Sequence, residues 1–215
     1  MPQRVRTYTQ DSLQLNYLLF LPENYSEKQK YPLIFFLHGA GERGSDPELL
    51  KLHGIPKVVE EKPDFPFIAV SPQCPLGRWW TNYDPAFFNG LLENVILTHS
   101  VDTDRLYLTG LSMGGYGCWH FAIACPDRFA AIVPICGGGD PSKVCVLKDV
   151  PIWVFHGAKD STVLPRESIK MVDALKECGG NVKFTLFPNA DHDAWTRTYN
   201  SPRLYEWLLE QKRGE

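Results

Sequence analysis

The sequence predicts an α/β fold: a mostly parallel, doubly wound sheet of about eight strands with helices on both of its faces. Two observations lead to this prediction. Apolar runs of strand length alternate with segments of helical periodicity from residue 33 to the C-terminal region. The run at residues 33–37 is apolar at every position, which is typical of a strand that a parallel sheet buries on both faces. Strand–helix–strand connections in such a sheet are right-handed.

The boundaries of the elements follow from the residues that interrupt the apolar pattern. A polar turn at residues 10–12 separates the first two strands, and Pro126 and the pair Gly179 and Gly180 end two helices. The predicted strands cover residues 7–9, 15–21, 33–37, 67–71, 105–109, 130–135, 152–155 and 182–187. The predicted helices cover residues 87–98, 114–125, 166–178 and 201–211. Because no repeat or linker interrupts this series, residues 1–215 are expected to form a single catalytic domain.

Composition and charge narrow the classes of function. Of the 215 residues, 44% are hydrophobic and 22% are charged, which excludes a disordered chain. The formal net charge is −3, and without a basic excess we expect no binding to nucleic acid. No apolar run approaches the roughly 18 residues of a membrane span, so no membrane partner is expected. Since the N-terminus lacks an apolar signal core, the chain as given is expected to be cytoplasmic, or secreted if a leader or domain was removed.

Cysteine usage gives a further expectation. A chain of this size builds its own core without disulfides, so we expect six free thiols, most of them buried. The spacing leaves a bridge between Cys136 and Cys145 as the alternative. No cluster of histidines and cysteines has the spacing of metal ligands, and we expect neither a metal nor an organic cofactor.

Ligands of open parallel sheets bind at the carboxyl ends of the strands, where the chain places His38, Ser112, Asp160 and His192. Ser112 is the centre of Gly-Leu-Ser-Met-Gly at residues 110–114, between a predicted strand and a predicted helix. This setting is that of a nucleophile elbow, in which a sharp turn exposes the serine hydroxyl and the glycines prevent collisions with the neighbouring strand and helix. The N-terminus of the following helix favours the negative charge that develops there.

A serine hydroxyl needs a general base, and the chain order of serine, acid and histidine supplies one. Asp160 and His192 each follow a predicted strand, at the same edge of the sheet as Ser112. We assign His192 as general base and then general acid, and Asp160 as the carboxylate that orients it. His156 is a poorer base candidate, because the glycine after it indicates a packed turn. Asp140, which also follows a strand, is the main alternative for the acid.

Acyl transfer also needs donors for the oxyanion of the tetrahedral intermediate. The backbone N–H of Met113, directly after the nucleophile, is the first expected donor. The second is expected in the loop at residues 38–44, whose glycines allow the backbone to approach a substrate carbonyl. Ala40 is our candidate there, with Gly41 as the neighbouring alternative.

Three side chains of this loop are suited to holding it in place. His38 lies at its start, and an imidazole in such a position is expected to brace the loop rather than to catalyse. Glu42 and Arg43 carry opposite charges, and we expect them to pair and so to support the donor backbone.

These residues together resemble a known family. The loop at residues 38–44 (HGAGERG) and the elbow at residues 110–117 (GLSMGGYG), with Asp160 and His192, are similar to α/β-hydrolases. They look most like bacterial serine carboxylesterases of the phospholipase/carboxylesterase and dienelactone-hydrolase-like group, which includes feruloyl-esterase-like domains. The resemblance covers nearly the whole chain and implies hydrolysis of a small-molecule ester by a catalytic triad with an oxyanion hole. Dienelactone hydrolases carry cysteine in the elbow, so Ser112 argues against their substrate.

The surroundings of the expected site indicate a small ester substrate. Only residues 136–151 separate two predicted strands at the place where many lipases insert a lid, so we expect no large lid and an open site. Trp79, Trp80 and Trp195 follow strands at the same edge and are our candidates for substrate binding. Packing of these tryptophans in the core is the alternative for each.

The favoured function is a serine carboxylesterase that acts on short-to-medium or aromatic acyl esters through a Ser112 acyl-enzyme. A peptidase like prolyl oligopeptidase shares the layout, although 215 residues leave no room for its usual gating domain. A thioesterase is chemically close and remains open. A non-catalytic binding protein on the same fold is the alternative from another class, since a fold does not dictate its function.

Overall fold

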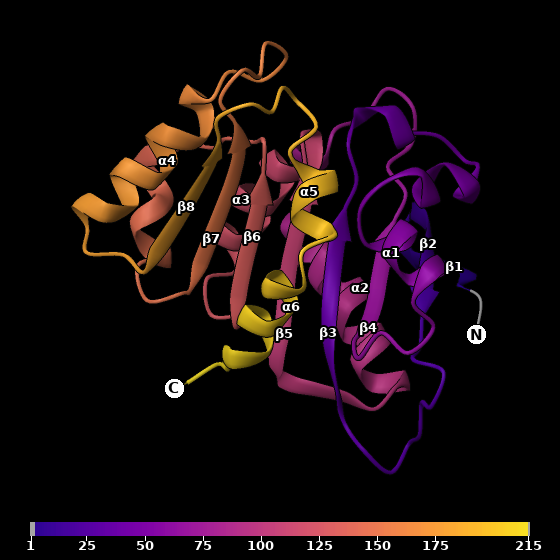
Figure 1. The fold of residues 1–215 in the computed structure, drawn as a ribbon. Helices are drawn as coiled ribbons and strands as arrows, with labels where there is room; N and C mark the ends of the chain where they lie inside the picture. The colour runs from indigo at the N-terminus through magenta and orange to yellow at the C-terminus, as the bar shows by residue number, and fades with distance from the viewer. Residues whose placement is uncertain (1–2, 215) are drawn as a thin grey trace.

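The structure, a computed structural model that describes residues 3–214, contains one twisted sheet of eight strands (Figure 1). The strand order is β1-β2-β4-β3-β5-β6-β7-β8. The pairs β1–β2 and β2–β4 are antiparallel, and all pairs from β4 to β8 are parallel. The strands are β1 (Arg4–Gln10), β2 (Leu13–Phe20), β3 (Tyr31–Leu37), β4 (Ile68–Pro72), β5 (Val101–Leu111), β6 (Ala131–Ile135), β7 (Ile152–Gly157) and β8 (Val182–Phe187). Residues 1, 2 and 215 of the predicted domain lie outside the described part.

Each predicted strand is present, and β8 has the predicted bounds. β5 begins at Val101 rather than at residue 105, because Val101 already pairs with Tyr31 of β3 although partly exposed polar residues follow it. β3 lies beside β5 in the middle of the sheet, and its seven residues are all buried, as its apolar sequence predicts. The mostly parallel, doubly wound architecture is therefore confirmed.

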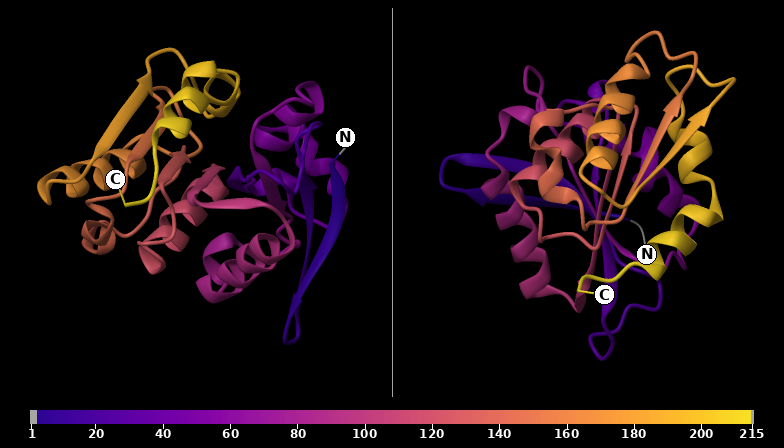
Figure 2. Two further views of the ribbon diagram at one scale, coloured as in Figure 1. Left: turned by 90° about the horizontal axis from the view of Figure 1, so that it is seen from below. Right: turned by 90° about the vertical axis from the view of Figure 1, so that its left-hand side faces the viewer.

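Helices cover both faces of the sheet (Figure 2). One core lies between the sheet and α2, α3 and α4, and a second lies between the sheet and α1, α5 and α6. The helices are α1 (Gly54–Glu61), α2 (Pro85–Thr98), α3 (Met113–Ala124), α4 (Arg166–Glu177), α5 (Trp195–Tyr199) and α6 (Pro202–Glu210). The sequence pattern did not predict α1 and α5, which are too short to show a clear helical period. None of the helices in residues 3–214 is long and apolar enough to cross a membrane.

The segment between β6 and β7 contains the short 3-10 helix η4 (Pro141–Leu147) and no lid domain, as expected. It also contains one half of a disulfide that links Cys145 to Cys178 at the end of α4. The expectation of six free thiols is therefore wrong, and so is the alternative pairing of Cys136 with Cys145. The four other cysteines are free, and Cys74, Cys118 and Cys136 among them are buried. Spacing did not predict the bridge because it joins elements that only the fold brings together.

Candidate active site

The nucleophile elbow lies between β5 and α3, at the centre of the sheet edge. Ser112 has φ 52° and ψ −115°, a conformation that non-glycine residues rarely adopt. Its amide donates to the Ile135 carbonyl of β6 at 2.9 Å, which holds the turn against the neighbouring strand. A Cβ at Gly114 would overlap the carbonyl of Leu37, and a Cβ at Gly110 would lie 2.5 Å from the Gly114 carbonyl. The sharp turn therefore requires both glycines, as the sequence motif predicts.

Ser112, His192 and Asp160 lie in one hydrogen-bonded chain. The Ser112 hydroxyl Oγ lies 2.9 Å from His192 Nε2, and His192 Nδ1 lies 2.7 Å from Asp160 Oδ2. The three residues follow β5, β7 and β8, so the parallel sheet brings them to one edge from three separate parts of the chain. Donation from Nδ1–H to the carboxylate leaves the lone pair of Nε2 pointing at the serine hydroxyl. His192 Nε2 can therefore accept the proton of the Ser112 hydroxyl.

The environment keeps Asp160 ionised. Burial acts to raise the pKa of Asp160, but the hydrogen bond from His192 and those from the Val163 and Thr162 amides outweigh it, so the pKa lies below its ordinary value. His156 Nε2 lies 3.1 Å from the same carboxylate and donates to the Val163 carbonyl at 2.8 Å. Burial lowers the pKa of His156, which favours its neutral form. His156 thus flanks the acid and lies away from the serine, as its packed position predicts.

The alternative acids lie elsewhere. Asp140 is exposed at the start of η4, where its carboxylate accepts from the Ser142 amide and pairs with Lys143 at 3.5 Å. Asp191 and Asp193 flank His192 in sequence but accept hydrogen bonds from backbone amides rather than from its ring.

The expected oxyanion donors are both at helix starts. Met113 is the first residue of α3, and Ala40 is the first residue of the 3-10 helix η1 (Ala40–Glu42). The amides of first helical residues have no partner within their helix, which leaves them available to a ligand. A Cβ at Gly39 would lie 3.7 Å from the Ser112 Cβ, so the loop runs directly beside the nucleophile.

His38 braces this loop, as predicted. Its Nε2 accepts from the Cys74 amide at 2.9 Å, so the ring is neutral there and carries its proton on Nδ1. The His38 carbonyl accepts from the indole of Trp80 at 2.8 Å, and the two rings meet edge to face. Trp80 is completely buried, so it has no surface for a substrate. Its predicted place among the substrate-binding residues is wrong, and it supports the loop instead.

Glu42 and Arg43 also brace the loop, but not by pairing with each other. The Glu42 carboxylate is buried between His38 and His53, 3.7 Å from a ring nitrogen of each. Burial acts to raise the pKa of Glu42, and the interactions with His38 and His53 outweigh it, so the net shift is downward. Arg43 Nε donates to the Ala40 carbonyl at 2.9 Å, and its guanidinium lies 5.5 Å from the centre of the Trp79 ring. The expected Glu42–Arg43 pair is corrected to two separate contacts.

The other two tryptophans remain accessible. Trp79 is 46% exposed and lies against Arg43 of the loop at residues 38–44. Trp195 is partly buried, and its ring packs edge to face on the ring of His192, with centroids 5.0 Å apart. Substrate binding by these two residues stays a prediction.

Cys136, which sequence reasoning did not place in the site, lies directly behind the triad. Ligand atoms of Cys136, Asp160 and His192 lie within 4.8 Å of one another, close enough for a metal. However, burial raises the pKa of the Cys136 thiol to about 12, so the thiol stays protonated and donates to the His192 carbonyl at 3.2 Å. This contact holds the loop that carries His192. The position of Cys136 directly after β6, like that of Ser112 directly after β5, is the sequence signal that could have placed Cys136 in the site.

The chain is also similar to known proteins. The model of the prolyl oligopeptidase family matches residues 139–213. Feruloyl esterase D of Neurospora crassa is 28% identical over 167 residues, which are 68% of this chain and 53% of that protein. Acyl-protein thioesterase 1 homolog 2 of Dictyostelium discoideum is 24% identical and covers 75% of the chain, which in turn covers 85% of that protein.

Solved structures show the same fold. A thermostable esterase has a TM-score of 0.86 and 34% identity, over 99% of this chain and 64% of that one. The feruloyl esterase module from Clostridium thermocellum complexed with sinapinate has a TM-score of 0.75 and 18% identity, over 94% of this chain and 87% of that one. The chain spans about half the length of the feruloyl esterase from Neurospora crassa. The comparisons confirm the α/β-hydrolase fold and the resemblance to feruloyl-esterase-like carboxylesterases.

Proposed function

We propose that this chain, an α/β-hydrolase of the feruloyl-esterase-like carboxylesterase group, hydrolyses carboxylic esters through an acyl-enzyme on Ser112. The observation that supports the proposal is the hydrogen-bonded chain from Ser112 through His192 to Asp160, at 2.9 and 2.7 Å. Hydroxyl, imidazole and carboxylate in this order form the arrangement of a serine hydrolase. Several relatives are named as esterases, and this chain contains a hydroxyl, an imidazole and a carboxylate in the arrangement that ester hydrolysis needs.

Acylation begins when His192 Nε2 takes the Ser112 proton as Oγ attacks the ester carbonyl carbon. The carbonyl oxygen becomes an oxyanion, which the amides of Met113 and Ala40 stabilise. Asp160 stabilises the imidazolium that forms, and its lowered pKa keeps it charged for this role. The intermediate collapses when the C–O bond to the alcohol breaks and His192 returns its proton to the leaving oxygen.

Deacylation repeats these steps with water. His192 takes a proton from the water that attacks the acyl carbon, the same two amides stabilise the second oxyanion, and the proton then returns to Ser112 Oγ as the acid leaves. The open edge without a lid favours short or aromatic acyl esters in solution over aggregated lipid. Feruloyl esterases among the relatives indicate hydroxycinnamoyl esters as the first class to test.

The experiment compares the wild type with Ser112→Ala on p-nitrophenyl acetate, butyrate and decanoate. Loss of the nucleophile is expected to lower kcat by about 10⁶-fold, with the acetate or butyrate the best wild-type substrate.

The rival activities have different outcomes. Ser112-dependent cleavage of a peptide anilide without ester cleavage would replace the proposal with a peptidase, and a preference for acyl thioesters would replace it with a thioesterase. Turnover that survives in Ser112→Ala would contradict the proposed role of Ser112.

A further inference from the structure

His156 is a buried histidine that the proposed reaction does not use, yet it contacts the carboxylate of the triad. It belongs to β7, and its side chain is completely buried. Its Nε2 lies 3.1 Å from Asp160 Oδ2, the oxygen to which His192 Nδ1 donates at 2.7 Å. The carboxylate therefore lies between two imidazole rings, and both rings approach the same oxygen.

The neighbours of His156 show where its ring carries a proton. Nε2 faces two acceptors, the Val163 carbonyl oxygen at 2.8 Å and the Asp160 carboxylate, so this nitrogen is the donor. Burial lowers the pKa of His156 and favours the neutral ring, in which Nδ1 is the acceptor. Nδ1 lies 2.7 Å from the hydroxyl oxygen of Ser168 in α4, which can donate to it. The ring is thus held in the tautomer that presents an N–H to Asp160.

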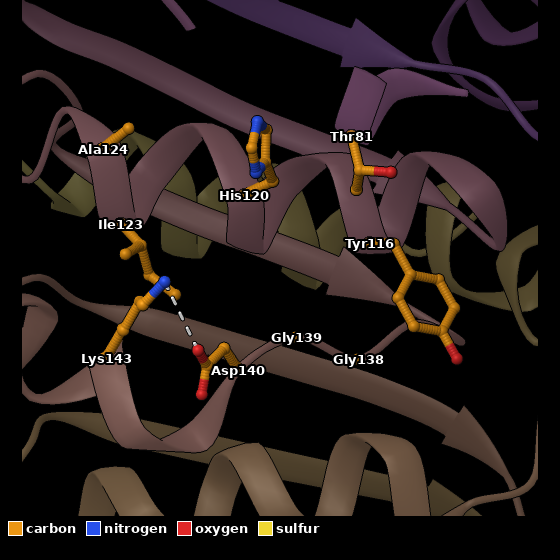
Figure 3. A pocket seen from close by; sticks show the side chains of 9 residues that line it. All are labelled: Thr81, Tyr116, His120, Ile123, Ala124, Gly138, Gly139, Asp140 and Lys143. Atoms are coloured by element: carbon orange, nitrogen blue, oxygen red, sulfur yellow. Dashed lines mark ion pairs between the residues drawn. The ribbon is translucent and has the colours of Figure 1, made fainter. Parts of the chain in front are cut away.

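Ser168 extends this contact to the segment that follows β6. Its Oγ also lies 2.9 Å from the Gly137 carbonyl oxygen, so the hydroxyl hydrogen lies between two acceptors. Gly137 packs on the first turn of α3, where a Cβ on it would overlap the backbone of Gly115. Gly138, the next residue, lines a cavity together with Tyr116 of α3 (Figure 3). The segment therefore contacts the helix that begins directly after the nucleophile.

These contacts form a closed path around the triad. The first branch runs from Asp160 through His192 to Ser112, which precedes α3. The second branch runs from the same carboxylate through His156 and Ser168, and it reaches the first turn of α3 by way of the segment after β6. His156 and Ser168 have no exposed surface, whereas His192 is partly exposed. The buried branch is therefore suited to hold the carboxylate, and the accessible branch to transfer protons.

The two oxygens of the carboxylate are held in different ways. Oδ1 of Asp160 accepts from the amides of Thr162 and Val163, at 2.9 Å each. These amides belong to the same loop as Asp160, so they fix the carboxylate to the loop and not to the sheet. His156 belongs to a strand in the sheet, and its contact with Oδ2 joins the carboxylate to that strand.

We propose that His156 is a positioning residue, which holds Asp160 Oδ2 in line with His192 Nδ1 while Ser168 holds the His156 ring. The proposal rests on the proposed esterase activity and adds to it two residues that act only through the carboxylate. A carboxylate held in place stabilises the imidazolium of His192 as it forms. The effect of His156 therefore belongs to the transition state, and it changes kcat rather than KM.

Two amide variants separate the two contacts of the ring. In His156→Gln, the side-chain amide reaches the position of Nε2, and its two N–H groups face the Val163 carbonyl and Asp160. In His156→Asn, the shorter side chain places its amide near the position of Nδ1, beside Ser168 and away from Asp160. Both variants lose the buried ring, so a loss of stability is common to them. Tyr205→Phe is the control, because it removes one buried hydrogen bond of α6 away from the triad.

Two quantities are measured: steady-state kinetics on p-nitrophenyl acetate, and the proton magnetic resonance of the His192 Nδ1–H that is donated to Asp160. We expect His156→Asn to lower kcat about 10- to 100-fold with KM within about twofold, and to shift this resonance. His156→Gln and Tyr205→Phe should keep kcat within about threefold of the wild type and leave the resonance in place. A purely structural role of His156 would affect both amide variants alike.

Ser168→Ala is a second test, which keeps the ring of His156 and removes only the hydroxyl at Nδ1. It should lower kcat about three- to tenfold at unchanged KM. Equal kcat in the two folded amide variants, or an unchanged kcat and His192 resonance in Ser168→Ala, would overturn the proposal. A wild type without Ser112-dependent turnover would instead overturn the proposed function, and the resonance alone would then decide whether His156 holds the carboxylate.

Discussion

The two flanks of Ser112 are built in opposite ways. On one side, the loop that carries Ala40 is held by buried polar contacts, including the bonds of His38 to the Cys74 amide and to the Trp80 indole. On the other side, the stripe of α3 formed by Tyr116, His120, Ile123 and Ala124 is accessible, with Ala124 exposed and the other three residues partly buried. A donor that stabilises an oxyanion must be fixed before the reaction begins, whereas an accessible surface that takes no part in the reaction needs no such bracing.

This difference separates the kinetic effects that we expect of substitutions. Changes in the braced loop should lower kcat with little effect on KM, because the oxyanion exists only near the transition state. Changes on the accessible side, along α3 and η4, should affect kcat much less. The predictions below test this separation.

Among the variants that test this comparison, the largest effect is expected for His38→Ala. The substitution leaves the buried Cys74 amide without its acceptor and the buried Glu42 carboxylate without one of its two histidines. We expect a loss of about 2–4 kcal/mol in the free energy of unfolding and, as the loop relaxes, a drop of about 100-fold in kcat. Urea unfolding and steady-state kinetics on p-nitrophenyl acetate measure the two quantities.

His53→Ala is the matched control for this prediction, since His53 contacts the same carboxylate but is half exposed and lies outside the loop. Its kcat should stay within about threefold of the wild type. A His38 variant that raises KM and leaves kcat intact would show that the loop binds substrate rather than stabilising the oxyanion.

The disulfide tests the accessible side. Cys145 and Cys178 join η4, whose Lys143 lines a cavity together with His120 and Ile123 of α3, to the end of α4. The double variant Cys145→Ser/Cys178→Ser should lower Tm by about 6–12 °C, while acetate hydrolysis at 25 °C stays near the wild-type rate because Ser112 is remote from the bridge. Thermal unfolding followed by circular dichroism measures the shift.

Cys125→Ser, which removes a free and partly buried thiol, is the control for the disulfide. Thiol titration of the denatured protein should find four thiols before reduction and six after it, in keeping with the four free cysteines of the structure. Six thiols without reduction would mean that the bridge does not form. A double variant with the Tm of the wild type would mean that the bridge contributes nothing to stability.

Much of the fold and of the site follows from the sequence because local signals specify them. The period of apolar residues marks all eight strands, and the order of residues after strands marks Ser112, Asp160 and His192 as neighbours at one edge. The glycines of the elbow are equally local, since the collisions that they avoid lie in adjacent elements. Parallel topology then converts sequence position into spatial proximity.

What the sequence could not predict depends on contacts between distant segments. The Glu42 carboxylate lies beside His53, at the start of α1. The sequence does not predict α1, because the helix contains a proline and is too short to show a clear apolar period. Trp79 and Trp80 are adjacent, yet one is 46% exposed and the other completely buried, because the 3-10 helix there turns successive side chains to different sides. Pairing of Cys145 with Cys178 depends in the same way on how η4 packs on α4.

The smallest effect is expected for Arg43→Ala, at the outer end of the braced loop. Arg43 donates to the Ala40 carbonyl and lies over the Trp79 ring, and both contacts are near solvent. We expect kcat to fall by about two- to fivefold, since exposed contacts of this kind contribute about 0.5–1 kcal/mol. Steady-state kinetics at low and high salt measure the change. Arg43→Lys keeps the charge over Trp79 and loses the bond from Nε. If the kcat of Arg43→Lys matches that of Arg43→Ala, the hydrogen bond to Ala40 fixes the loop. If it matches that of the wild type, the contact with the Trp79 ring fixes the loop. An increase in kcat in both variants would contradict a bracing role for Arg43.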